Sequence, residues 1–79
     1  MNADKGRIVK PTAGKESNGF YVVVKADEKF VYIADGKKRK LSKPKRKNPK
    51  HLRSTNKIIE MDQITDKKLR IVLGNMSTP

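Results

Sequence analysis

The sequence predicts a small, mostly β domain that ends in one short helix. Two runs rich in β-branched and aromatic residues, 20–25 and 30–34, are typical of strands on a half-buried pleated surface. A polar stretch, 26–29, separates the two runs and predicts a turn between them. Residues 64–74 instead carry apolar side chains at helical spacing. With 79 residues, the chain has room for one domain with a small core.

Two shorter strands are predicted on either side of this central pair. Residues 7–10 alternate apolar and charged side chains after Gly6, and Pro11 should end their ladder. Residues 12–19 read as a loop, because Gly14, Asn18 and Gly19 tolerate positive φ. Residues 51–55 predict a short last strand.

The Asp35-Gly36 pair predicts a tight hairpin, because a type I′ turn requires positive φ at both central residues. Residues 37–41 should then return antiparallel to 30–34, as a charged strand at an edge of the sheet. Residues 42–50 contain Pro44 and Pro49, which predict an extended loop facing solvent.

The C-terminal helix has marked ends. Thr65 is a suitable N-cap, and Asp66 favours the positive end of the helix dipole. Ile64 and Leu69 occupy the positions of a hydrophobic staple, and Gly74 suits the residue after the helix. One face of this helix is apolar, with Leu69, Val72 and Leu73. We therefore expect one domain over residues 6–74, with flexible ends at 1–5 and 75–79.

Positive charge dominates the middle of the chain. The formal net charge is +12, and ten of the twenty Lys and Arg residues lie between positions 37 and 53. No acidic residue lies between Asp35 and Glu60. Crowded cations repel one another unless anions lie nearby, so the expected partner is RNA or DNA. The ten cations, which we call the basic stretch, are Lys37, Lys38, Arg39, Lys40, Lys43, Lys45, Arg46, Lys47, Lys50 and Arg53.

The sequence contains no motif for metal binding, nucleotide binding, catalysis or membrane insertion. The chain has no cysteine and a single histidine, His51, so we expect neither a metal site nor a cofactor. The segment 12–16 is unlike a phosphate-binding loop, because Glu16 follows Lys15 where Ser or Thr is required. The eight carboxylates are scattered, which argues against an enzyme. No basic amphipathic helix is predicted, and no apolar run is long enough for a bilayer, so no membrane role is expected.

The order of motifs resembles a known family. Gly6-x-x-Val9, Ala13-Gly14-Lys15 and the run 20–24 look like a KOW motif. The continuation resembles the small bacterial KOW-domain RNA-binding proteins, which are related to KOW-bearing large-subunit ribosomal proteins of archaea and eukaryotes. It consists of Ala34-Asp35-Gly36, Arg39-Lys40, Lys43-Pro44-Lys45 and Lys50-His51-Leu52 leading to Thr55. The resemblance covers roughly residues 6–73.

One departure from the family pattern lies in the first loop. Four residues separate Gly14 from Gly19, where three are usual. Either Asn18 takes the usual glycine place, because Asn tolerates the left-handed conformation, or the loop is longer by one residue.

The resemblance implies a small five-stranded barrel of the Src-homology-three type with a C-terminal helix. It also implies a non-enzymatic, cytoplasmic protein that is a monomer when free and that binds RNA, most simply ribosomal RNA, with ribosomal proteins as possible neighbours. A protein-interaction module of transcription or translation factors and a DNA-binding protein of low specificity are the alternatives. The candidate RNA-binding residues are the basic stretch together with Lys10, Lys15, Asn18 and His51.

The aromatic residues allow two interpretations. In a small β domain such side chains belong to the core, but one or two of them could stack on unpaired bases. Tyr21 and Tyr32 are the first candidates for stacking among Phe20, Tyr21, Phe30 and Tyr32.

Overall fold

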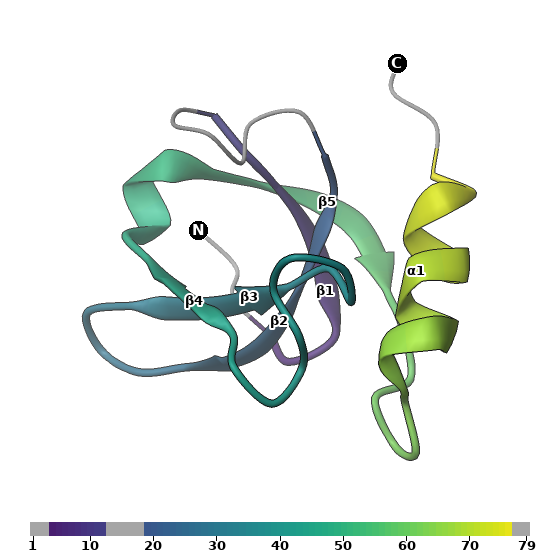
Figure 1. Cartoon of the computed structure of the whole chain (residues 1–79). Coiled ribbons are helices and arrows are strands. Elements are labelled where there is room, and N and C mark those ends of the chain that lie inside the picture. Colours follow the sequence, from purple (N-terminus) through teal and green to yellow (C-terminus); the bar gives the residue numbers. More distant parts are fainter. Residues whose placement is uncertain (1–3, 13–18, 77–79) are drawn as a thin grey trace.

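The computed structural model describes residues 4–12 and 19–76. Five antiparallel strands form one sheet in the order β4-β3-β2-β1-β5, and a helix follows at the C-terminus (Figure 1). The mostly β class with a C-terminal helix is therefore confirmed. The elements are β1 (Arg7–Pro11), β2 (Tyr21–Ala26), β3 (Val31–Ala34), β4 (Lys45–Lys47), the 3₁₀ helix η1 (Pro49–His51), β5 (Leu52–Ile58) and α1 (Asp66–Gly74).

The two edge strands of the sheet are β4 and β5. Among the described residues they do not pair with each other, so the sheet is not closed into a barrel. The structure contains a bent antiparallel sheet whose edge strands β4 and β5 are joined by Asn48 and the three residues of η1.

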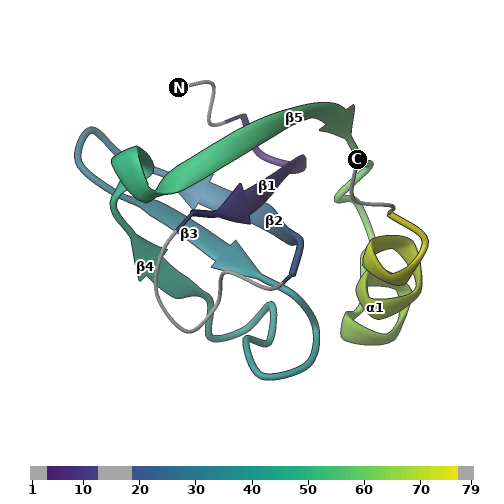
Figure 2. The same cartoon turned by 90° about the horizontal axis from the view of Figure 1, so that it is seen from above.

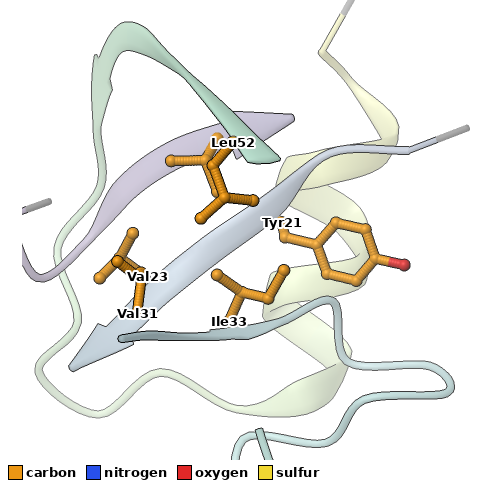
Figure 3. Close-up of a cluster of buried hydrophobic side chains, with 6 residues drawn as sticks. Tyr21, Val23, Val31, Ile33 and Leu52 are labelled. Carbon is orange, nitrogen blue, oxygen red and sulfur yellow. The ribbon is translucent and has the colours of Figure 1, made fainter. Parts of the chain in front are cut away.

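Each face of the sheet carries its own core, because successive side chains of a strand point to opposite faces. One core, the inner cluster, contains Val9, Tyr21, Val23, Val31, Ile33 and Leu52 and is gathered between the strands (Figure 3). On the other face, Ile8, Val22 and Ala34 pack against Leu69 and Leu73 of α1. Figure 2 shows this helix lying alongside the sheet.

The strands of the first half follow the sequence prediction closely. The expected runs 7–10, 20–25 and 30–34 all form strands, with bounds that shift by one residue. β1 ends at Pro11, as predicted, and includes this proline as its last residue, opposite Leu52. Proline lacks an N–H but keeps a carbonyl, so it is tolerated at the end of a strand.

β5 is longer than the predicted segment 51–55, and β1 holds it in place. Arg7 donates from Nη1 to the Thr55 carbonyl at 2.9 Å, and Thr55 donates from Oγ1 to the Ile8 carbonyl at 2.8 Å. Both contacts lie beside the register shift between Arg7 and Val9. A bulge leaves backbone groups without ladder partners, and these side-chain bonds occupy two of them.

The predicted hairpin at Asp35-Gly36 is wrong. Only Gly36 has positive φ, at 79°, and the segment 37–41 is not a strand. The Asp35 carboxylate accepts hydrogen bonds from the backbone amides of Lys37 and Arg39, at 2.8 and 3.0 Å, and folds the chain into a loop. The strand that pairs with β3 is β4, which lies inside the segment 42–50 that was predicted to be a loop.

The helix prediction holds at its start and fails at its end. Thr65 is the N-cap, with its Oγ1 accepting from the Lys68 amide at 3.1 Å. Gly74, which was expected to follow the helix, is its last residue, and Asn75 is the C-cap. Asn75 closes the helix with a right-handed backbone, so no left-handed glycine is required there. No helix in the described part of the chain is long and apolar enough to cross a membrane.

Candidate nucleic-acid interface

The edge strand β4 holds three consecutive cations. Lys45 lies opposite Ile33, Arg46 opposite Tyr32 and Lys47 opposite Val31. Residues directly opposite in a sheet share a face, so Lys45 and Lys47 lie on the inner face, at the rim of the inner cluster, and Arg46 lies on the outer face. Lys45 and Lys47 are half-buried and Arg46 is exposed. Long basic side chains can cover apolar atoms with their stems while the charged ends stay in water.

Cations and aromatic rings meet on the outer face of the sheet. The Arg46 guanidinium carbon lies 4.6 Å from the centroid of the Phe30 ring, and the Lys25 ammonium lies 4.7 Å from that of Tyr32. Both distances are within the range of an attractive cation–π contact. Phe30 and Tyr32 share the face of Ala34, but they lie beyond the part that α1 covers and stay half-buried.

A second pair of cations lies where β1 meets β5. Lys10 and Arg53 are directly opposite each other in the ladder. Like charges at such positions repel, and a bound phosphate would remove the cost. The Lys10 ammonium lies 5.5 Å from the centroid of the Phe20 ring. Lys10 and Arg53 were both predicted as RNA-binding, and the fold brings them together.

The loop after β3 is fastened to the helix. The Leu41 amide donates to Asp66 Oδ1 at 2.8 Å, and Arg70 donates from Nη1 to the Gly36 carbonyl at 2.7 Å. Lys40 adds a longer contact of 3.4 Å to the same carbonyl. These bonds fix the start and end of the loop, while Lys37 and Lys38 remain exposed between them.

The turn before β5 presents further candidates to solvent. Asn48 caps η1 by accepting from the Lys50 amide at 2.9 Å, and the Thr12 amide donates to the His51 carbonyl at 2.8 Å. The side chains of Lys50 and His51 are exposed, as is that of Lys43 in the preceding loop. In the described ranges, His51 belongs to no group of three or more metal-binding side chains.

The carboxylates of the described residues mainly serve backbone amides. Asp27, Asp35, Asp66 and Glu60 all accept hydrogen bonds from main-chain N–H groups. Over residues 4–12 and 19–76, one ion pair forms, between Arg7 and Asp4 at 3.1 Å. These acidic groups shape turns, and no carboxylate of the described residues lies within 4 Å of the charged groups of Lys45, Arg46 and Lys47.

One carboxyl group has a perturbed pKa. The backbone amide of Phe30, and after it that of Lys29, donates to Asp27 and lowers the pKa of this carboxyl below its ordinary value of 3.8. Hydrogen bonds to the ionised form stabilise it. Asp27 is therefore an anion at neutral pH, on the same side of the domain as Arg46 and Phe30.

The predicted site residues fall into separate groups. Lys45, Arg46 and Lys47 form one group on β4, Lys10 and Arg53 a second, and the loop carrying Lys37, Lys38, Arg39 and Lys40 a third. Arg39 is half-buried and its carbonyl accepts from the amides of Asp35 and Gly36. Lys15 and Asn18 lie outside the described residues.

Sequence reasoning missed Lys25 and Arg70. Lys25 stands at the end of β2, where a hairpin with β3 places it beside Tyr32, and that spacing was visible in the sequence. The role of Arg70 could not be predicted from the sequence, because its hydrogen bond to the Gly36 carbonyl joins residues 34 positions apart. Of the aromatic candidates, Tyr21 is buried in the inner cluster, which leaves Tyr32 and Phe30 on the open face.

No protein-family model matches the chain, and no curated protein matches it significantly. The resemblance to KOW-domain proteins therefore rests on the motifs of the sequence, and it remains a prediction.

Proposed function

We propose that this protein is a non-enzymatic, cytoplasmic RNA-binding protein of the KOW type that associates with ribosomal RNA. One observation supports the proposal most directly. Among residues 4–12 and 19–76, several carboxylates accept hydrogen bonds from backbone amides, and none forms an ion pair with a cation of β4. A net charge of +12 in 79 residues favours a polyanionic partner.

The fold supports the proposal through the position of the cations. β4 is an edge strand, so its three basic residues are accessible from the side of the sheet. The bent sheet, with edges joined by η1, suits a barrel of the Src-homology-three type, in which the two edges approach without a full ladder. Such a barrel would carry phosphate contacts on its rim and leave its interior to Val9, Val23 and Ile33.

The aromatic residues favour RNA over duplex DNA. Phe30 and Tyr32 lie half-buried beside Arg46 and Lys25, where they can stack on bases only if those bases are unpaired. Single-stranded loops with exposed bases are common in folded RNA and absent from regular duplex DNA.

The salt dependence of binding tests the proposal. For a structured RNA with single-stranded loops, the logarithm of the association constant should fall linearly with the logarithm of the salt concentration, with a slope of about −0.7 to −0.9 per phosphate contacted. A duplex DNA of equal length serves as competitor. An affinity that does not change between low and moderate salt would contradict the proposal.

A variant of β4 gives the matched control. Changing Lys45, Arg46 and Lys47 together to glutamine should reduce the magnitude of the salt slope by about 2, because two or three phosphate contacts are lost. The control changes Lys57, Lys67 and Lys68, which are exposed on β5 and α1, and removes the same charge. If both variants weaken binding equally, net charge alone acts and β4 is not the interface. Crosslinking in cells followed by sequencing of the attached RNA should recover ribosomal RNA.

A further inference from the structure

A pocket of about 470 Å³ opens on the outer face of the sheet, between the turn after β2 and the edge strand β4. Its lining combines acidic, aromatic and basic side chains, and phosphate binding alone does not account for an acidic group there. The residues are Asp27, Glu28, Lys29, Phe30, Tyr32 and Arg46.

The walls of this pocket suit a flat aromatic ligand. Phe30 and Tyr32 are two positions apart on β3, so their rings lie on the same face of the sheet. Arg46 covers one ring and Lys25 the other, at 4.6 and 4.7 Å from the ring centroids. Aromatic rings and guanidinium planes both stack on nucleobases, and such stacking does not by itself distinguish one base from another.

The turn that lines one side of the pocket adds a hydrogen-bond acceptor, the Asp27 carboxylate. Asp27 Oδ1 accepts from the amides of Lys29 and Phe30, at 2.9 and 2.7 Å, and holds the turn. Asp27 Oδ2 has one long contact of 3.4 Å, to the Tyr32 hydroxyl. An ionised carboxylate has about four acceptor positions, so Oδ2 can accept further hydrogen bonds. An anion repels phosphate, and it therefore selects for N–H donors of the ligand.

Guanine is the common RNA base that matches this acceptor best. Its Watson–Crick edge presents two adjacent donors, N1–H and the N2 amino group, and both can donate to Oδ2, because Oδ1 already accepts from two backbone amides. Adenine and cytosine place an acceptor beside their amino group, and uracil places acceptors on both sides of its single N–H. A carboxylate facing those acceptors would lose part of the interaction through repulsion.

Resting on the RNA-binding function proposed above, we infer that this pocket holds one unpaired guanine of the bound RNA, stacked on the Arg46 guanidinium that lies over Phe30 and read by the Asp27 carboxylate. A phosphate of that nucleotide lies against Arg46, the cation of β4 that shares the outer face with the pocket. The cations thus supply affinity, and Asp27 supplies base preference.

The test uses short uridine oligomers with one central position changed to guanosine, inosine or adenosine, and measures their dissociation constants for the full chain. Guanosine should bind about five- to tenfold more tightly than adenosine. Inosine, which lacks the N2 amino group, should fall between them. Equal affinities for all three would overturn the guanine site while leaving RNA binding intact. Absence of binding to every oligomer and to structured RNA would overturn the proposed function as well.

Two variants separate the roles of the pocket residues. Asp27→Asn keeps an oxygen for the turn amides but places an amino group beside the carbonyl, so the preference for guanosine over adenosine should disappear. Asp62→Asn, which removes the same charge from an exposed position away from the pocket, should keep that preference. Because both variants gain one unit of net charge, the ratio of the two affinities cancels the general electrostatic gain. Circular dichroism and thermal unfolding of each variant verify the fold.

The stacking part of the site has its own variant. Phe30→Leu retains an apolar side chain but removes the aromatic face that supports the Arg46 guanidinium, and it should weaken binding of all three oligomers by about fivefold. Unchanged affinities in Phe30→Leu, or a guanosine preference that survives in Asp27→Asn, would overturn the assignment of the base to this pocket.

Discussion

Gly36 lies against the backbone of the C-terminal helix: a Cβ atom at this position would be 2.5 Å from the carbonyl oxygen of Asp66. The same glycine has φ of 79°, which side chains rarely adopt. Asp66 also accepts from the Leu41 amide, and Arg70 donates to the Gly36 carbonyl. The helix and the loop after β3 are thus joined by a close approach that requires glycine and by two hydrogen bonds.

Substituting this glycine should be costly. Gly36→Ala combines a positive φ with a clash against backbone, and we expect it to lower the free energy of unfolding by about 1–3 kcal/mol. Gly74→Ala is the matched control, because a Cβ there meets nothing within 4 Å. Alanine at that helical position should instead stabilise the protein by about 0.5–1 kcal/mol. Urea unfolding of both variants measures the difference, and a Gly36→Ala variant as stable as the parent would show that the loop can move away from α1.

The hydrogen bond from the Leu41 amide to the Asp66 carboxylate should also stabilise the folded protein. Asp66→Ala leaves a half-buried amide without its acceptor and should cost about 1–3 kcal/mol in the free energy of unfolding. Asp66→Asn keeps an acceptor oxygen, so its cost should be smaller. Asp62→Ala, four positions earlier and exposed, provides the control. Equal stability of the Asp66→Ala and Asp62→Ala variants in chemical unfolding would contradict the role assigned to this bond.

α1 packs on the sheet through the face of the helix that carries Leu69 and Leu73. Leu69 is fully buried against Ile8 and Val22, whereas Ile71 is 57% exposed. Leu69→Ala should therefore cost about 2–5 kcal/mol, while Ile71→Ala should change stability by about 0.5 kcal/mol or less. Thermal unfolding compares the two. If the two substitutions had similar effects, α1 would not be docked through this face.

The lowered pKa of Asp27 predicts a dependence of stability on acid. Because the folded-state pKa lies below the ordinary value of 3.8, the ionised group stabilises the folded protein at pH values above that value. This contribution is lost as the pH falls through the lowered pKa. The unfolding temperature of the parent should exceed that of Asp27→Asn near neutral pH, and the difference should shrink in strong acid. A difference that stayed constant into acid would show that the charge of Asp27 does not support the turn.

The parts of the fold that the sequence predicted are those decided within a few residues. The β-branched runs of β2 and β3 and the Thr65 cap of α1 depend on local propensity and local hydrogen bonds, and all three are present. The segment Lys45–Lys47 has no such signal, because lysine and arginine have low strand propensity. Pairing with β3 and the contact of Arg46 with Phe30 form this strand, and neither can be read locally.

The candidate site likewise has features that the sequence predicted and others that it could not predict. The excess of positive charge and the position of its densest run were visible in the sequence. Of the fourteen named candidates, Lys15 and Asn18 lie outside the described residues, and the other twelve are half-buried or exposed. The pocket beside Arg46 could not be predicted, because it joins a turn near residue 27 to a strand near residue 46.

By itself, the amino-acid order determined the class of the fold, the ends of most strands and the negative charge of the expected partner. Periodicity, capping and charge all act over short ranges of sequence. Only the tertiary structure decided which segment pairs with β3 and which side of β4 each cation faces. Asp66 and Arg70 form hydrogen bonds with the loop after β3, where the Asp35-Gly36 pair had predicted a tight hairpin. The strand that pairs with β3 therefore begins at Lys45 and not directly after Gly36. Contacts between residues 25 and 34 positions apart outweighed the preference of two adjacent ones.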